Sequence, residues 1–136
     1  MDIKEAQKFL SEHHEGVLVT RKKDGGLQMS PVTPGIDNDG HVIISTRETA
    51  YKTRNIRRNP RVSLCVFTEA FVGPWLRLDG TASVQSLPKA MDPLIYWQRQ
   101  IKGEHPNWAE YQDKMNREKR VMVRIAIERV GPERKG

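Results

Sequence analysis

Short apolar segments separated by turn-forming residues constrain the fold of this chain more than any other feature of its sequence. Segments of strand length, rich in β-branched or aromatic residues, span residues 16–21, 27–34, 41–46, 61–67, 75–85 and 121–127. Turn formers stand between several of them, as in Asp24-Gly25-Gly26 and Asp37-Asn38-Asp39-Gly40. Short strands joined by such turns favour an antiparallel β-barrel.

Glycine and proline refine this prediction at three places. Pro31 and Pro34 cannot donate ladder hydrogen bonds, so the segment 27–34 is expected at a sheet edge or to contain a bulge. Asp79-Gly80 interrupts the segment 75–85, where an aspartate beside a glycine is more typical of a bulge than of a catalytic carboxylate. The strands are therefore expected to curve.

Helices are expected to flank these strands. Apolar residues at helical spacing predict helices over residues 2–14, 91–101 and 108–115, and the cap and stop signals around residues 50–58 predict a short helix there, second in chain order. Thr49 is placed to cap the second of these helices, and Pro60 ends it. A length of 136 residues without a composition break predicts one domain over residues 1–136, mainly β with flanking α.

The positive charge of the chain is concentrated in one segment. Residues 47–61 contain six basic residues and one acid, a balance of +5 out of a total of +6, so the other 121 residues carry about +1. This concentration favours one compact anion over a long nucleic-acid backbone. A nucleic-acid-binding barrel is the more remote alternative, because the few aromatic residues do not interleave with the basic ones.

The start of the helix predicted over residues 50–58 has the chemistry of a phosphate site. Its free amides and its dipole attract an anion. Lys52 offers a mobile charge, Thr53 a hydroxyl and Arg54 a planar fork, while Arg57 and Arg58 extend the positive field. No Walker-type or dinucleotide-binding glycine motif is present.

This segment is similar to the split-barrel flavin and deazaflavin oxidoreductases related to pyridoxamine 5'-phosphate oxidase. The resemblance covers about residues 9–130 and rests on the motifs at residues 16–20, 24–25, 43–46, 52–61 and 78–82. It implies a six-stranded antiparallel split β-barrel of the FMN-binding type. It also implies a homodimer with the cofactor in a groove at the subunit interface.

The resemblance assigns cofactor contacts residue by residue. The implied set is Gln28, Ser30, Pro31, Val32, Ile44, Ser45, Thr46, Ala50, Lys52, Thr53, Asn55, Arg57 and Trp75. Lys52 and Thr53 would hold the phosphate, the strand residues would line the ring, and Trp75 would approach from the partner subunit. Ala50 stands where some relatives have an arginine.

The sequence departs from two branches of this family. It lacks the Arg-Pro and tryptophan-rich substrate motif of pyridoxamine phosphate oxidase itself, and it lacks a Trp-Tyr-x-Asn-Leu segment of the deazaflavin-dependent nitroreductases. The resemblance therefore implies coenzyme F420 as cofactor, with hydride transfer from its reduced form to an unsaturated or conjugated small molecule. An FMN-binding oxidoreductase or electron carrier is the alternative, and no catalytic side chain is identified.

The remaining reactive residues predict no further site. The four histidines show no metal-ligand spacing, so no metal is expected, and Trp97 and Trp108 occupy apolar helix positions typical of a core or a dimer contact. Cys65 is the only cysteine, which excludes an internal disulfide. Neither a membrane-spanning segment nor a signal-like start is apparent, so a cytoplasmic location is expected.

Overall fold

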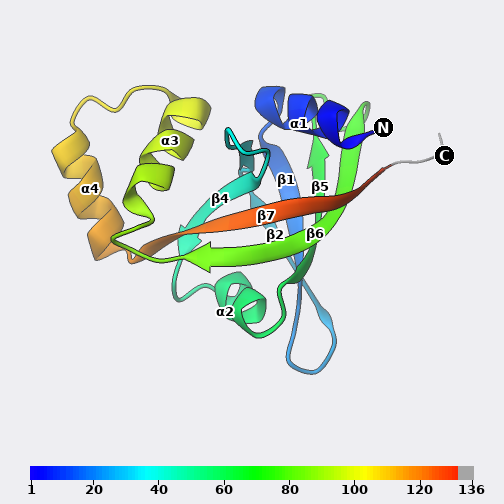
Figure 1. The fold of residues 1–136 in the computed structure, drawn as a ribbon, viewed down its shortest axis with the longest axis horizontal. Coiled ribbons are helices and arrows are strands. Elements are labelled where there is room, and N and C mark those ends of the chain that lie inside the picture. The colour runs from blue at the N-terminus through cyan, green and yellow to red at the C-terminus, as the bar shows by residue number, and fades with distance from the viewer. Residues whose placement is uncertain (132–136) are drawn as a thin grey trace.

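The computed structural model describes residues 1–131, which form an antiparallel sheet curled into a half-barrel and flanked by helices (Figure 1). The strands are β1 (Glu15–Arg21), β2 (Leu27–Val32), β3 (Gly35–Ile36), β4 (Val42–Arg47), β5 (Arg61–Phe67), β6 (Trp75–Gln85) and β7 (Arg120–Gly131). The helices are α1 (Ile3–Glu12), α2 (Tyr51–Arg58), α3 (Met91–Lys102) and α4 (Trp108–Arg117). Along the sheet the order is β2-β1-β5-β6-β7-β4-β3.

The sheet has seven strands, whereas the sequence pattern predicts six. The additional strand is β3, in which Gly35 pairs with Ile43 and Ile36 with Val42 across the turn at residues 37–40. A strand of two residues is too short to show an alternation of apolar and polar side chains, so the sequence pattern did not predict β3. The curled antiparallel sheet is otherwise consistent with the predicted split-barrel type of fold.

The expectations about glycine and proline are confirmed, and the predicted helix cap is wrong. Pro31 lies on β2, which is an edge strand, and the pairing of β6 with β7 shifts register between Asp79 and Gly80. Ala50, not Thr49, is the N-cap of α2, and its side chain cannot accept a hydrogen bond. The amide of Ala50 bonds to the Arg47 carbonyl in a tight turn, which delays the helix by one residue.

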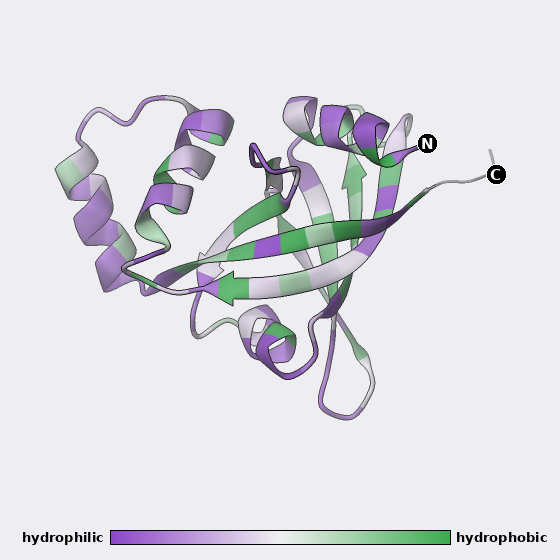
Figure 2. Ribbon diagram, in the orientation of Figure 1, coloured by the Kyte–Doolittle hydropathy of each residue, from purple (hydrophilic) through white to green (hydrophobic). Residues whose placement is uncertain are grey.

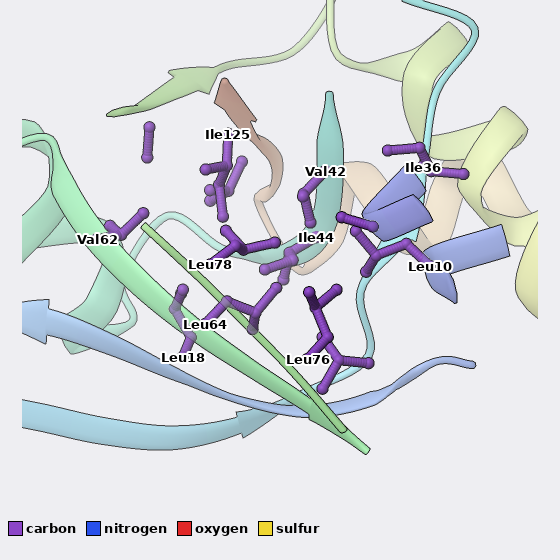
Figure 3. Packing of buried hydrophobic residues seen from close by; sticks show 14 of the residues in the cluster. Leu10, Leu18, Ile36, Val42, Ile44, Val62, Leu64, Leu76, Leu78 and Ile125 are labelled. Carbon is purple, nitrogen blue, oxygen red and sulfur yellow. The ribbon is translucent and has the colours of Figure 1, made fainter. Parts of the chain in front are cut away.

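One hydrophobic cluster fills the concave side of the half-barrel. Side chains from α1 and from β1, β4, β5, β6 and β7 point toward one another there, as Figure 3 shows for Leu10, Leu18, Ile44, Leu64, Leu76, Leu78 and Ile125. Each fully buried leucine or isoleucine stabilises the fold by about 1.5–3 kcal/mol relative to an exposed one. This cluster therefore fixes the curvature of the sheet.

A second cluster attaches α3 and α4 to the outer face of β4 and β7. Ile43 and Met122 contribute from the strands, and Leu94, Trp97 and Met115 contribute from the helices. β4 is covered on both faces, because Val42 and Ile44 belong to the first cluster and Ile43 to the second. This explains its apolar run, and Figure 2 shows the first part of β4 in the green of hydrophobic residues. Within residues 1–131, no helix is long and apolar enough to cross a membrane.

Candidate functional site

Helix α2 is joined by side-chain hydrogen bonds to strands from opposite ends of the sheet order. On one side, Thr53 Oγ1 donates to the carbonyl of Arg47 at the end of β4, at 2.7 Å. On the other side, Asn55 Nδ2 donates to Thr20 Oγ1 on β1 at 3.1 Å, and Asn55 Oδ1 accepts from Arg58 at 2.9 Å. Thr53 and Asn55 are both buried. These bonds hold the start of α2 beside the end of β4.

The two buried polar side chains of α2 therefore have a positioning role in the single chain. The hydroxyl proton of Thr53 and an amide proton of Asn55 are already committed to protein acceptors. Direct contact of either side chain with a cofactor phosphate stays a prediction. Their buried bonds determine where the neighbouring Lys52 lies.

Lys52 is the half-buried cation at the start of α2. Among residues 1–131, none of the ion pairs includes its ammonium group, because Glu48 pairs with Arg57 and Glu118 with Arg120. Burial, and secondarily the charge of Arg120, lower the pKa of Lys52. No side chain caps the first-turn amides of α2. An anion placed here would relieve both the charge repulsion and the unsatisfied amides.

The arginines that end α2 are engaged within the protein. Arg57 forms a bidentate ion pair with Glu48, with distances of 2.6 and 3.1 Å, and also donates to Ser86 at 3.0 Å. Arg58 donates to the carbonyl of Arg21 at 2.8 Å. Arg54, in contrast, is exposed and lies over the Tyr51 ring at 5.9 Å. Arg57 is thus less available to a ligand than its place in the sequence suggests.

The predicted residues of β2 divide between the two faces of that strand. Gln28, Ser30 and Val32 alternate on the face shared with Leu18, whereas Pro31 is exposed on the other face. The Ser30 hydroxyl is buried and has no hydrogen-bond partner in the described part of the chain. A ligand group placed beside this hydroxyl would supply the missing bond.

The predicted residues of β4 also face in opposite directions. Ile44 and Thr46 are buried toward the half-barrel, and Ser45 faces α3 and α4. β3 pairs only with Val42 and Ile43, so within residues 1–131 the same edge of β4 has no strand beside it from Ile44 onward. A ring at this edge would therefore contact the β4 backbone, as edge strands present free peptide groups.

Trp75 does not join the other predicted residues within one chain. It begins β6, and Ala82, whose amide bonds to Pro60 just after α2, lies seven residues further along the strand. That separation is roughly 20 Å. Trp75 is 44% exposed. The contact of Trp75 from a partner subunit, which the sequence resemblance implies, stays a prediction.

A basic pocket between α3, α4 and the ends of β4 and β7 was not found from the sequence. It has a volume of about 220 Å³ and is lined by Ser45, Trp97, Gln98, Lys102, His105, Tyr111, Lys114, Met115 and Arg120. The Tyr111 hydroxyl donates to the carbonyl of Leu94 at 2.9 Å, and burial raises the pKa of Tyr111 to about 12. The cations of the pocket come from α3, α4 and β7, so no local sequence motif indicates it.

The turn before β4 brings two carboxylates beside a histidine, a group that the sequence spacing did not indicate. Side-chain atoms of Asp37, Asp39 and His41 lie within 4.8 Å of one another. Arg124 contacts all three, at 3.2 Å from Asp37, 3.6 Å from Asp39 and 3.1 Å from His41. Asp37 also accepts the amides of Asp39 and His41. The Arg124 guanidinium already balances the charge of the two aspartates. We therefore interpret Asp37, Asp39, His41 and Arg124 as a group that stabilises the turn and not as a metal site.

The sequence of this chain matches the model of a known protein family. Residues 3–132 match the family model described as pyridoxamine 5'-phosphate oxidase. The chain belongs to the pyridoxamine 5'-phosphate oxidase family. Its members include flavin-type oxidoreductases, and the split-barrel resemblance inferred from the sequence is confirmed.

Several solved structures have a similar fold. A conserved hypothetical protein from Mycobacterium tuberculosis has a TM-score of 0.78 and 22% identity, over 96% of this chain and 82% of that one. An F420 reductase has a TM-score of 0.69 and 19% sequence identity, and the match covers 92% of this chain and 94% of that one. A putative pyridoxamine 5'-phosphate oxidase from Listeria innocua has a TM-score of 0.67 and 17% sequence identity, and the match covers 95% of each chain. At these identities the likeness concerns the fold alone.

Proposed function

We propose that the protein is a reductase that uses reduced coenzyme F420 to transfer a hydride to an unsaturated or conjugated small molecule. The observation that carries the proposal is Lys52, a half-buried cation outside all ion pairs of the described residues, at the uncapped start of α2. The likeness to an F420 reductase supports the choice of deazaflavin. FMN is the competing cofactor.

The residues present fit such a cofactor. When bound, the reduced deazaflavin supplies the hydride. Lys52 and the first-turn amides of α2 would hold the phosphate, and the β4 backbone from Ile44 to Thr46 would hold one edge of the ring. The unpaired hydroxyl of Ser30 would bond to the other edge. Arg54, which is exposed, is the α2 arginine best placed for the carboxylate tail.

The cofactor test compares F420 with FMN on the same preparation. Each is titrated into the purified protein, and tryptophan fluorescence and calorimetry report binding. The carboxylate tail adds charge that favours F420 at a basic site, so we expect F420 to bind at least about tenfold more tightly. Tighter binding of FMN, or a protein that purifies with a bound yellow flavin, would overturn the proposal.

We further propose that the outer face of the sheet forms a homodimer. Large apolar side chains are exposed at two places: on β2, with exposed fractions of 51% for Leu27 and 64% for Met29, and at the start of β6 and just before it, with 44% for Trp75, 70% for Phe71 and 82% for Val72. Large apolar side chains exposed on one face of a sheet are typical of interfaces. A partner on this face would bring its Trp75 region toward the site, which the single chain leaves incomplete.

Substitution of Met29 with glutamate is expected to disrupt this dimer. A buried, unpaired carboxylate at an apolar interface costs several kcal/mol, enough to make the monomer the main species at micromolar concentration. Sedimentation velocity measures the change. Gln112→Glu, on the exposed face of α4, adds the same charge and should leave the dimer intact. A dimer that survives Met29→Glu unchanged would contradict this choice of face.

A further inference from the structure

The basic pocket beside Ser45 carries more positive charge than its neighbouring acid neutralises. Lys102, Lys114 and Arg120 line it, and no aspartate or glutamate of residues 1–131 does so. Glu118, just outside, pairs with Arg120 at 2.8 Å and with Lys114 at 3.9 Å. Burial acts to raise the pKa of Glu118, but the hydrogen bond and charge of Arg120 outweigh it and lower that pKa. One carboxylate thus faces several cations.

The neutral side chains of the pocket add an N–H donor and apolar surface. His105 Nδ1 accepts the backbone amide of Asn107 at 3.0 Å, so the proton of the neutral ring lies on Nε2. His105 packs against Tyr111, with ring centroids 5.5 Å apart. Trp97 and Met115 supply apolar surface. The pocket therefore combines cations and an N–H donor with a flat hydrophobic side.

The size and place of the pocket limit what it can hold. At about 220 Å³ it is smaller than the roughly 300–1,000 Å³ typical of sites for drug-sized ligands. It therefore accommodates a small organic acid or one end of a longer molecule. Ser45 lines the pocket from β4, and Arg120 lines it from the start of β7. The pocket therefore adjoins the edge of β4 at which the cofactor ring is proposed to bind.

We propose that this pocket binds the carboxylate of a small conjugated organic acid, which is the substrate of the reductase. Lys102, Lys114 and Arg120 attract the carboxylate, His105 donates a hydrogen bond, and Trp97 contacts the conjugated body. The substrate assignment rests on the proposed function, because only a cofactor at β4 makes the neighbouring pocket a reaction site. Carboxylate recognition itself does not depend on the cofactor.

The first experiment tests recognition without cofactor. Calorimetry compares cinnamate with cinnamamide, which has a similar shape without the charge. Charge-assisted bonds are expected to make cinnamate bind at least about tenfold more tightly. In ¹⁵N-labelled protein, the indole N–H of Trp97 should shift and that of Trp75 should not. Equal binding of acid and amide, no saturable binding in the millimolar range, or shifts confined to Trp75 would overturn the proposal.

Charge-matched variants locate the anion. Lys102 and Lys114 are both exposed enough to be replaced without loss of the fold. The double variant Lys102→Gln/Lys114→Gln should lower cinnamate affinity about tenfold and leave cinnamamide unaffected. Lys22→Gln/Lys89→Gln removes the same charge from exposed positions outside the pocket and should change neither. An equal loss in both double variants would show non-specific attraction and overturn the site.

A second arm distinguishes the substrate from the cofactor as the source of the carboxylate. Cinnamate is titrated again into protein saturated with F420. Retained binding supports a substrate carboxylate, whereas competition would assign the pocket to the cofactor's own tail and overturn the substrate assignment. If the protein binds cinnamate but does not bind F420, the proposed F420-dependent function is wrong, and carboxylate recognition by the pocket still holds. The two failures are thus distinguishable.

Discussion

Substitution of Gly80 with alanine is expected to lower the free energy of unfolding by about 3 kcal/mol, near the upper end of typical overpacking effects. A β-carbon at Gly80 would lie 2.2 Å from the carbonyl oxygen of Ala126 and 2.8 Å from Ile125 Cγ2. The nearer obstacle is backbone of β7, which cannot rotate away as a side chain can. The two longest strands would have to separate at the bulge.

Urea denaturation and thermal melting measure this loss. For a domain of this size, the melting temperature should fall by roughly 10 °C. Gly26→Ala is the matched control, because its nearest neighbour is the Asp24 carboxylate at 3.0 Å, in an exposed turn. That variant should change stability by less than about 1 kcal/mol. A similarly small loss for Gly80→Ala would show that β6 and β7 can move apart at little cost.

Gly80 also illustrates which parts of the fold the sequence could predict. A glycine beside an aspartate inside a strand segment indicates a bulge, and the register shift between Asp79 and Gly80 confirms it. The other strands and the helices were predictable from local signals as well: apolar runs or alternation and turn residues for the strands, and helical spacing or caps for the helices. β3 was not, because its two residues pair only after the turn at 37–40 has folded.

The candidate site was predictable only along its local segment. The charge and order of residues in α2 are visible in the sequence, so Lys52 was found. The direction of each side chain was not, and Thr53 and Asn55 prove to point inward to Arg47 and Thr20. The basic pocket was not predicted, because its cationic side chains come close together only when α3 and α4 pack against β4 and β7.

Replacement of Lys52 with glutamine is expected to weaken F420 binding by about 10- to 100-fold. This range corresponds to about 1.5–3 kcal/mol for a charge-assisted hydrogen bond to phosphate. A deazaflavin that lacks the phosphate and the tail should bind the variant and the wild-type protein equally. Calorimetry of both ligands with both proteins gives the comparison. Equal losses for the two ligands would show that Lys52 supports the fold of the site and does not contact the phosphate.

The affinity should also depend on pH in a way that identifies Lys52. Burial and the charge of Arg120 lower the pKa of Lys52 in the free protein, and a bound phosphate would raise it again by stabilising the charged form. Affinity is therefore constant at low pH, where Lys52 is already protonated. It falls as pH rises through the lowered pKa, because binding must then take up a proton.

Two variants separate this effect from other titrations. Lys52→Arg should abolish the fall in affinity, since a guanidinium stays charged throughout the range. Arg120→Gln should move the fall to higher pH, because it removes the repulsion that helps to lower the pKa of Lys52. If the fall persists unchanged in Lys52→Arg, another group governs the pH dependence. In that case the phosphate is held elsewhere, and the uncapped start of α2 serves only to position the end of β4.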